Sequence, residues 1–319
     1  MKIDYLEKST IDDIQNINFD FILFSSGYEK RARYIASNYN FQSKNKIALG
    51  FRKNKKLERE NNDTLFLEKG FKIVEVADNN SFKYIYAQYK DLLSTESKKI
   101  SVLVDISSMS TLMYSTLLDF FNDSTFYEEV NIYFIYVPAK IHKPQNSSSL
   151  AYNEPLSQNI GFTNRKISLI LGLGLEFDKG LGLSERFQVS PEELYLFETD
   201  NEYTTRVEEI NKDLISLVKA NDNDGNKIIK YDVSNVEFIT NSLSSLTNHL
   251  TQKGHRIIIA PAGPKIFTLI SLIIGLYNEN VSVYRASYGH NIEPINKHAN
   301  DKNQIIVTKV VFSKEKDIH

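Results

Sequence analysis

The chain of 319 residues contains one local pattern twice, and this repetition constrains the fold more than any other feature. Residues 100–110 read ISVLVDISSMS, which predicts a buried strand and a short polar loop, and an apolar helical run follows. Residues 256–265 read RIIIAPAGPK and lead into a second apolar run. Asp105 and Ala260 end the two predicted strands, and 260 − 105 = 155 residues separate them. We therefore expect two similar lobes.

Short apolar runs alternate with helical spacing along both halves, which is typical of α/β folds with parallel sheets and right-handed crossovers. Ser110 and Lys265, in the loops that follow the repeated strands, are also 265 − 110 = 155 residues apart. The pattern predicts two tandem Rossmann-like, three-layer lobes, at residues 1–150 and 151–319, related by an internal duplication of low sequence identity. Residues 304–312 are expected to add an extra edge strand to the second lobe.

The strands that we expect are short apolar runs bounded by polar or turn residues, and the runs in parallel sheets are nearly continuous. In the first half they cover residues 19–25, 46–51, 71–77, 100–106 and 130–137, and in the second half residues 167–171, 194–198, 228–233, 256–260 and 281–285. Residues 171–183, LGLGLEFDKGLGL, are interpreted as a glycine-rich loop.

Composition excludes several classes of site. The net charge of −2 gives no global basic field, so we do not expect direct binding of nucleic acid. The absence of cysteine excludes disulfides, thiolate catalysis and Cys-ligated zinc or iron–sulfur centres. The six histidines show no HxxxH or HExxH spacing, so no metal site is expected. The basic stretch at residues 52–59, RKNKKLER, is interpreted as a solvated helix face.

No segment of the sequence predicts a membrane span or a secretion signal. The longest apolar stretch, residues 266–277, is shorter than the roughly 18–20 residues that span a bilayer and is interpreted as a buried helix. The first residues, MKIDYLEKSTIDD, are charged and lack the apolar centre of a signal peptide. We therefore expect a cytoplasmic protein with no membrane association.

Ligands of open parallel sheets bind beyond the carboxyl ends of the strands, where the strand order reverses. The first candidate loop holds Ser25, Ser26 and Gly27 ahead of a predicted helix, and hydroxyls and backbone N–H groups there can bind an anion. Arg31 follows and is able to clamp a phosphate. The alternative is an ordinary capped helix with a solvated arginine.

The second candidate loop follows the fourth predicted strand. Asp105 ends that strand, where a carboxylate can bind a ribose hydroxyl or act as a base. Ser107, Ser108 and Ser110 can contact phosphate or cap the next helix. The alternative is purely structural, with a serine cap and a satisfied carboxylate at the strand end.

The corresponding loop of the second half contains Gly263, Pro264 and Lys265. Glycine permits a close backbone approach, proline suits the start of a helix, and the lysine is placed to reach an anion. An ordinary strand-to-helix turn is the alternative.

A last candidate loop carries Arg285, Tyr288 and His290 after the last parallel strand of the second half. Its side chains could read a base or a phosphate, with His290 as an acid or base. The alternative is a solvated polar loop.

The motif DISSMS at residues 105–110, followed by an apolar helix, resembles the strand-four loop of CRISPR-associated Rossmann-fold (CARF) sensor domains. APAGPK at residues 260–265 resembles the same element. Two fused lobes of this kind are similar to SAVED domains, in which CARF-like units are joined in one chain. The resemblance implies a bacterial antiviral protein that binds cyclic oligonucleotides.

Three functions follow from these patterns. The first is a nucleotide sensor that holds its ligand in a cleft between the lobes and needs no cofactor. The second is an enzyme acting on a nucleotide or nucleic acid, with Asp105 or His290 as acid or base and Lys265 or Arg285 on the phosphate. The third is an interaction subunit that binds a partner protein encoded in the same operon.

Overall fold

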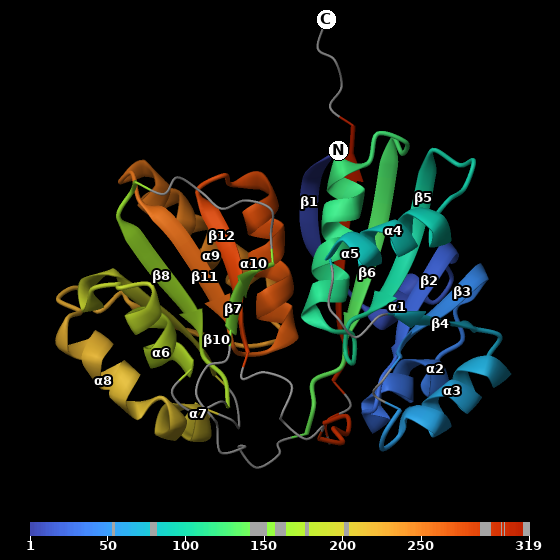
Figure 1. Ribbon diagram of the computed structural model, residues 1–319, viewed down its shortest axis with the longest axis horizontal. Coiled ribbons are helices and arrows are strands. Elements are labelled where there is room, and N and C mark those ends of the chain that lie inside the picture. Colours follow the sequence, from blue (N-terminus) through green and yellow to red (C-terminus); the bar gives the residue numbers. More distant parts are fainter. Residues whose placement is uncertain are drawn as a thin grey trace, which may run out of the picture. The chain divides into compact units, whose positions relative to one another are not determined.

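The computed structural model describes most of the chain, in two compact units. The first unit joins residues 1–142 to residues 293–319, and the second is the continuous segment 143–292 (Figure 1). The described residues are 1–52, 55–76, 82–140, 152–156, 164–175, 179–200, 204–287, 295–300, 302 and 304–314.

The first unit is built on a seven-stranded sheet of order β1-β13-β6-β5-β2-β3-β4. Strands β2 to β6 all run parallel to one another. Strand β13 is antiparallel to both β6 and β1. The strands are β1 (Lys2–Ser9), β2 (Asn18–Ser26), β3 (Gln42–Phe51), β4 (Lys72–Val76), β5 (Lys99–Asp105), β6 (Glu129–Tyr136) and β13 (Ile306–Ser313).

The second unit is built on a six-stranded sheet of order β10-β9-β8-β11-β12-β7. Five of these strands are parallel, and the short β7 runs antiparallel beside β12. The strands are β7 (Tyr152–Pro155), β8 (Ile167–Gly172), β9 (Leu194–Thr199), β10 (Ile228–Tyr231), β11 (Arg256–Pro261) and β12 (Val281–Ser287).

The two sheets share one topology. Numbered along the chain within each unit, the five parallel strands follow the order 3-2-1-4-5 in both, as β4-β3-β2-β5-β6 and as β10-β9-β8-β11-β12. This is the strand order of Rossmann folds. The helices that follow the fourth strands, α5 (Thr111–Asp123) and α10 (Lys265–Tyr277), have 13 residues each. The expected pair of duplicated Rossmann-like lobes is confirmed.

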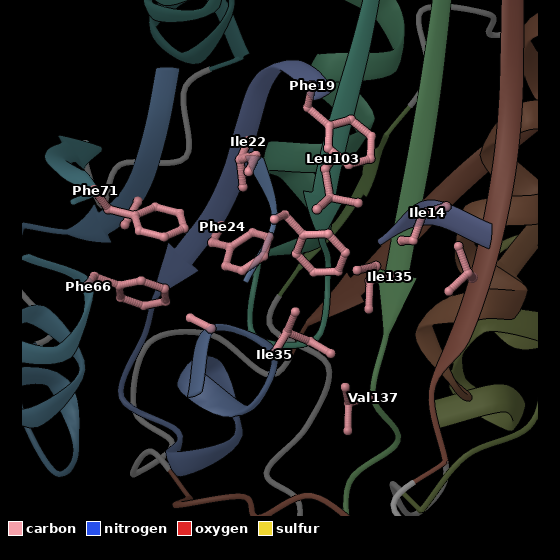
Figure 2. Packing of buried hydrophobic residues seen from close by; sticks show 14 residues of the cluster. Ile14, Phe19, Ile22, Phe24, Ile35, Phe66, Phe71, Leu103, Ile135 and Val137 are labelled. Atoms are coloured by element: carbon pink, nitrogen blue, oxygen red, sulfur yellow. The ribbon is translucent and has the colours of Figure 1, made fainter. Parts of the chain in front are cut away.

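Phenylalanine and aliphatic side chains form the core on one face of the first sheet, beneath α2 (Tyr34–Asn38) and α3 (Arg59–Glu68). Figure 2 shows Phe24 of β2 close to Phe66 and Phe71, and the ring centroids are 6.2 and 5.2 Å from that of Phe24. Burying a phenylalanine side chain of this kind contributes roughly 2–3 kcal/mol. On the opposite face, α4 (Phe82–Leu92) packs beside α5.

The second sheet is covered in the same way. Leucine and isoleucine side chains of β8, β9 and β11 pack against α6 (Lys179–Arg186), α7 (Thr204–Ile210) and α8 (Lys212–Ala220) on one face. Helices α9 (Val236–Gln252) and α10 pack against the other face, where the rings of Phe197 and Phe267 lie 5.1 Å apart. No helix in the described part of the chain has the length and apolar character needed to cross a membrane.

The expected place of the last strand is wrong. Residues 304–312 were predicted as an edge strand of the second lobe, but β13 lies inside the first sheet, between β1 and β6 (Figure 1). The second lobe therefore does not extend to residue 319, and its unit ends at residue 292. Six of the eight residues of β13 are buried, as an internal strand requires, but the sequence does not tell which sheet takes it. The predicted boundary near residue 150 falls outside the described residues.

Two further elements differ from the sequence prediction. Strand β1 was not predicted, because it is an exposed edge strand with charged side chains and shows no continuous apolar run. The last part of the expected glycine-rich loop forms helix α6 instead of a loop. At Gly180 in this helix, an added Cβ would lie 2.5 Å from a methyl group of Leu214, so the small residue permits α6 to pack closely on α8.

Candidate functional site

In each unit the strand order reverses between the first and the fourth parallel strand, and this position is where open α/β sheets bind ligands. In the first unit these strands are β2 and β5, and in the second they are β8 and β11. The structure thus brings the predicted Ser25, Ser26 and Gly27 beside the predicted Ser107 and Ser108. We call these the switch loops of each unit: residues 26–29 with 106–110, and residues 173–175 with 262–264.

The two switch loops of the first unit touch each other at Gly27. A Cβ added to Gly27 would overlap the Ser108 hydroxyl and would lie 3.5 Å from the Ser108 Cβ, so a larger residue there would require that hydroxyl to turn aside. Ser25, at the end of β2, is 3% exposed, and its Oγ has no hydrogen bond among the described residues. Buried polar atoms without a partner are rare in folded proteins and call for an explanation.

Asp105 shapes the loop in which it lies. Its carboxylate is 2% exposed, and Oδ1 accepts a hydrogen bond of 2.8 Å from the backbone N–H of Ser107. The Ser107 hydroxyl in turn accepts a bond of 2.8 Å from the N–H of Val137, beyond the end of β6. These contacts favour the structural alternative for Asp105, in which its buried carboxylate is satisfied by hydrogen bonds within the loop, over a role as an exposed general base.

Ser110 caps α5. Its hydroxyl accepts a hydrogen bond of 3.3 Å from the N–H of Met113, and Ser110 itself has the extended backbone typical of an N-cap. In the second unit Pro264 occupies the corresponding position before α10. The two caps are 264 − 110 = 154 residues apart, so the counterpart of Lys265 is Thr111 rather than Ser110.

Arg31 is neither solvated nor open on the surface. It is 4% exposed, and its Nε donates a hydrogen bond of 2.6 Å to Glu29, which is itself buried. Its NH1 donates a bond of 3.0 Å to the carbonyl of Val137. This buried ion pair ties the loop after β2 to the end of β6, a role that the sequence did not indicate.

Three polar residues of α3 hold the loop after β2, and the sequence analysis missed them. The hydroxyl of Ser26 donates a hydrogen bond of 2.5 Å to Asp63 Oδ1, which also accepts a bond of 2.8 Å from Arg59 Nε. Asn62, fully buried, donates bonds of 2.8 and 2.9 Å to the carbonyls of Gly27 and Glu29.

Arg59 corrects the interpretation of residues 52–59 as a solvated helix face, because it is only 1% exposed. Its NH1 donates a bond of 2.5 Å to the carbonyl of Phe51, and its Cζ would lie 2.7 Å from a Cβ added to Gly50. Arg59, Asn62 and Phe66 are spaced three and four residues apart and so share one helix face. That spacing is the signal that could have found them.

In the second unit the switch loops meet backbone to backbone. A Cβ added to Gly174 would overlap the carbonyl oxygen of Ala262 and lie 2.7 Å from its carbonyl carbon. A Cβ added to Gly263 would lie 2.5 Å from the carbonyl oxygen of Leu173. Packing between the loops therefore accounts for both glycines. Lys265, partly exposed, is the first residue of α10.

The remaining predicted loop is only partly described. Arg285 lies in β12 opposite Glu154 of β7, and the two side chains form an ion pair. Tyr288 and His290 lie outside the described residues.

A cluster at the opposite edge of the second sheet contains Ser168, Glu193 and His255. The Ser168 hydroxyl lies 2.8 Å from His255 Nδ1 and 2.8 Å from Glu193 Oε2, and Nδ1 also lies 3.2 Å from Oε2. A catalytic triad places serine and carboxylate on opposite ring nitrogens, whereas here both meet Nδ1. Since Ser168 is also fully buried, the cluster joins strands and does not resemble a nucleophile site.

A small pocket over the α2 face of the first sheet contains none of the predicted site residues. It is lined by aromatic and aliphatic side chains, an asparagine and two lysines: Ile22, Phe24, Ala36, Tyr39, Asn40, Phe41, Lys46, Lys69 and Phe71. Across the described residues, His, Asp and Glu side chains form no group of three or more that could hold a metal ion.

Helix α5 carries a buried carboxyl group, that of Asp119, in its second half. Asp119 is 4% exposed, and its Oδ2 has no hydrogen bond among the described residues. Burial, and then the charge of Asp123, raise the pKa of Asp119 to about 7. An acid with a raised pKa keeps its proton in the folded state at pH values where the unfolded chain has lost it.

This titration predicts a stability that falls as the pH rises from about 4 to about 7. The loss is roughly 4 kcal/mol, because each pKa unit corresponds to about 1.4 kcal/mol. Asp119→Asn, which stays neutral, should remove most of this slope and should unfold at higher denaturant concentration than the parent at pH 8. Urea unfolding of both proteins at pH 5 and pH 8 measures the effect. Parallel pH profiles would contradict it.

Comparison with known proteins found no matching protein-family model and no matching curated protein. The resemblance to CARF and SAVED domains therefore stays a prediction, and the geometry of the switch loops carries the functional argument.

Proposed function

We propose that the protein is a nucleotide-binding sensor or regulatory protein of a bacterial antiviral system. The ligand would bind at the carboxyl edge of the parallel sheet, and the resemblance of the DISSMS loop favours a cyclic oligonucleotide. The observation that carries the proposal is the meeting of two hydroxyl-bearing loops, at Gly27 and Ser108, where the strand order of the first sheet reverses.

Three features support an anionic ligand at this edge. The first amides of α5 point out of its N-terminus, where a helix attracts negative charge. The hydroxyl of Ser108, which is partly exposed, lies beside Gly27 and can donate a hydrogen bond to a ligand oxygen. The loop itself is held by the buried Arg31 and Asn62 and by the partly exposed Asp63, so its shape is fixed before binding.

The contacts of Asp105 favour binding over catalysis. A general base must reach the proton that it removes, whereas this carboxylate is 2% exposed and accepts a bond from its own loop. We expect Asp105 to position the loop that contacts the ligand.

Calorimetry with mononucleotides and with linear and cyclic oligonucleotides tests this proposal. We expect one of these classes to bind, and Ser108→Ala to weaken binding about tenfold, which corresponds to the loss of one hydrogen bond to a charged group. Ser245→Ala, at an exposed serine of α9, is the matched control and should bind as the parent does. The absence of any nucleotide binding would refute the proposal, as would unchanged affinity in Ser108→Ala.

A further inference from the structure

We propose that Arg52, Lys55 and Tyr84 form a second anion site at the carboxyl edge of the first sheet, which binds a phosphate group beside the switch loops. The site would extend the proposed nucleotide site across β3 and would select ligands that carry more than one phosphate. This inference rests on the proposed function.

The position of Arg52 places the site at the correct edge of the sheet. Ser26 of β2 is in register with Gly50 of β3, and neighbouring strands lie about 4.8 Å apart. Arg52 follows two residues after Gly50, and its N–H donates a bond of 3.2 Å to the carbonyl of Val76 at the end of β4. The side chain thus emerges one strand away from the loop that contains Ser26 and Gly27.

The charges of the site are incompletely neutralised. Arg52 Nε lies 3.8 Å from Glu75, and Lys55 Nζ lies 2.7 Å from the same carboxylate, so two cations share one anion. All three side chains are well exposed, at 54% for Arg52, 59% for Lys55 and 41% for Glu75. Exposed ion pairs of this kind contribute little to stability, because water screens them. Both cations can therefore turn from Glu75 to a phosphate at little cost.

An aromatic ring completes the site, and it comes from a different element. Tyr84 of α4 is 40% exposed, and its hydroxyl accepts a hydrogen bond of 3.5 Å from Arg52 NH2. The basic stretch at residues 52–59 contains no aromatic residue, which is why the sequence alone indicated only a solvated face. Sites for single-stranded nucleotides combine cations with aromatic rings on which bases stack.

The site stands on a rigid base. Arg59 is buried directly beneath this edge, where it bonds the carbonyl of Phe51 and the carboxylate of Asp63. The end of β3 is thus fixed to the N-terminal turn of α3. A fixed end reduces the conformational entropy that Arg52 would lose on binding.

Titration at several salt concentrations tests the site, with inorganic phosphate, a mononucleotide and a short single-stranded oligonucleotide as probes. Replacing both cations, in Arg52→Ala with Lys55→Ala, should weaken oligonucleotide binding at least tenfold. It should also lower the slope of log affinity against log salt by about 0.7, the value for one lost phosphate contact on a single strand. Lys44→Ala, at an exposed lysine near the opposite end of the same strand, is the control and should change neither quantity.

Glu75→Gln gives the complementary result. Removing the shared carboxylate should strengthen oligonucleotide binding severalfold, which a purely structural role of these residues would not produce. Binding of inorganic phosphate alone to the parent protein, and its loss in the double variant, would also support the site.

Oligonucleotide binding with unchanged affinity and salt slope in the double variant would overturn this inference and leave the proposed function standing. Failure of every nucleotide and of phosphate to bind the parent protein would overturn both.

Discussion

Gly174→Ala is expected to lower the free energy of unfolding of the second unit by about 3 kcal/mol, at the upper end for an overpacked site. The added Cβ would overlap the carbonyl group of Ala262, and backbone atoms cannot turn aside as a side chain can. Relief requires the switch loops to separate, which also removes the close contact of Gly263 with Leu173. Thermal unfolding should show a fall of the midpoint by roughly 10 °C for a unit of this size.

Gly225→Ala provides the control for this experiment. Gly225 has a φ of 68° and open space around its Cα, so alanine there meets backbone strain alone. That strain costs about 1 kcal/mol. A loss at Gly174 no larger than the loss at Gly225 would show that the two loops do not pack as described.

Arg59→Ala is expected to destabilise the first unit by about 3 kcal/mol. The change leaves the carbonyl of Phe51 without its donor and the carboxylate of Asp63 without its ion pair. Breaking a buried pair from one side costs about 3–5 kcal/mol, and the partial exposure of Asp63, at 29%, places this case at the lower end. Urea unfolding measures the loss, and Arg59→Lys should recover only part of it because lysine cannot form both bonds with the same geometry.

A double-mutant cycle with Gly50→Ala separates packing from charge. In the parent protein the added Cβ would lie 2.7 Å from Arg59 Cζ, and that guanidinium is held on two sides. In Arg59→Ala the space is open, so the same glycine substitution should cost at least 1 kcal/mol less. Strictly additive losses would contradict the contact between these residues.

Strands that are buried on both faces were predictable from the sequence. Residues 100–106 and 256–260 read as continuous apolar runs, and β5 and β11 cover the same segments to within one residue. Such runs report burial, which is a local property of the sequence. Strand β1 is exposed or half-buried along its length and carries charged side chains, so it lacks that signal and was missed for this reason. Strand order is not local either, so β13 was assigned to the wrong sheet.

The position of the candidate site was predictable from the sequence, but the residues that hold its loops were not. The rule that ligands bind beyond strand ends placed Asp105, Ser107 and Ser108 in one loop, and the fold brings this loop to Gly27. Asn62 was missed because its partners Gly27 and Glu29 lie more than 30 residues away in the sequence. Arg59 was missed because its place in a basic stretch suggested a solvated face, although its spacing from Asn62 and Phe66 puts it on the buried face of α3. Their polar character alone is equally typical of a solvated helix.

The place of β13 has a consequence for synthesis of the chain on the ribosome. Strand β1 pairs with no strand other than β13 among the described residues, and β13 is translated after all the other described strands. The second unit is continuous and lies entirely ahead of β13, so its residues emerge together and can fold first. The first unit must wait with an unfinished sheet edge until β13 has been translated. Nascent chains stalled before residue 306 should therefore expose to chaperones the edge of β6 that β13 covers in the folded unit.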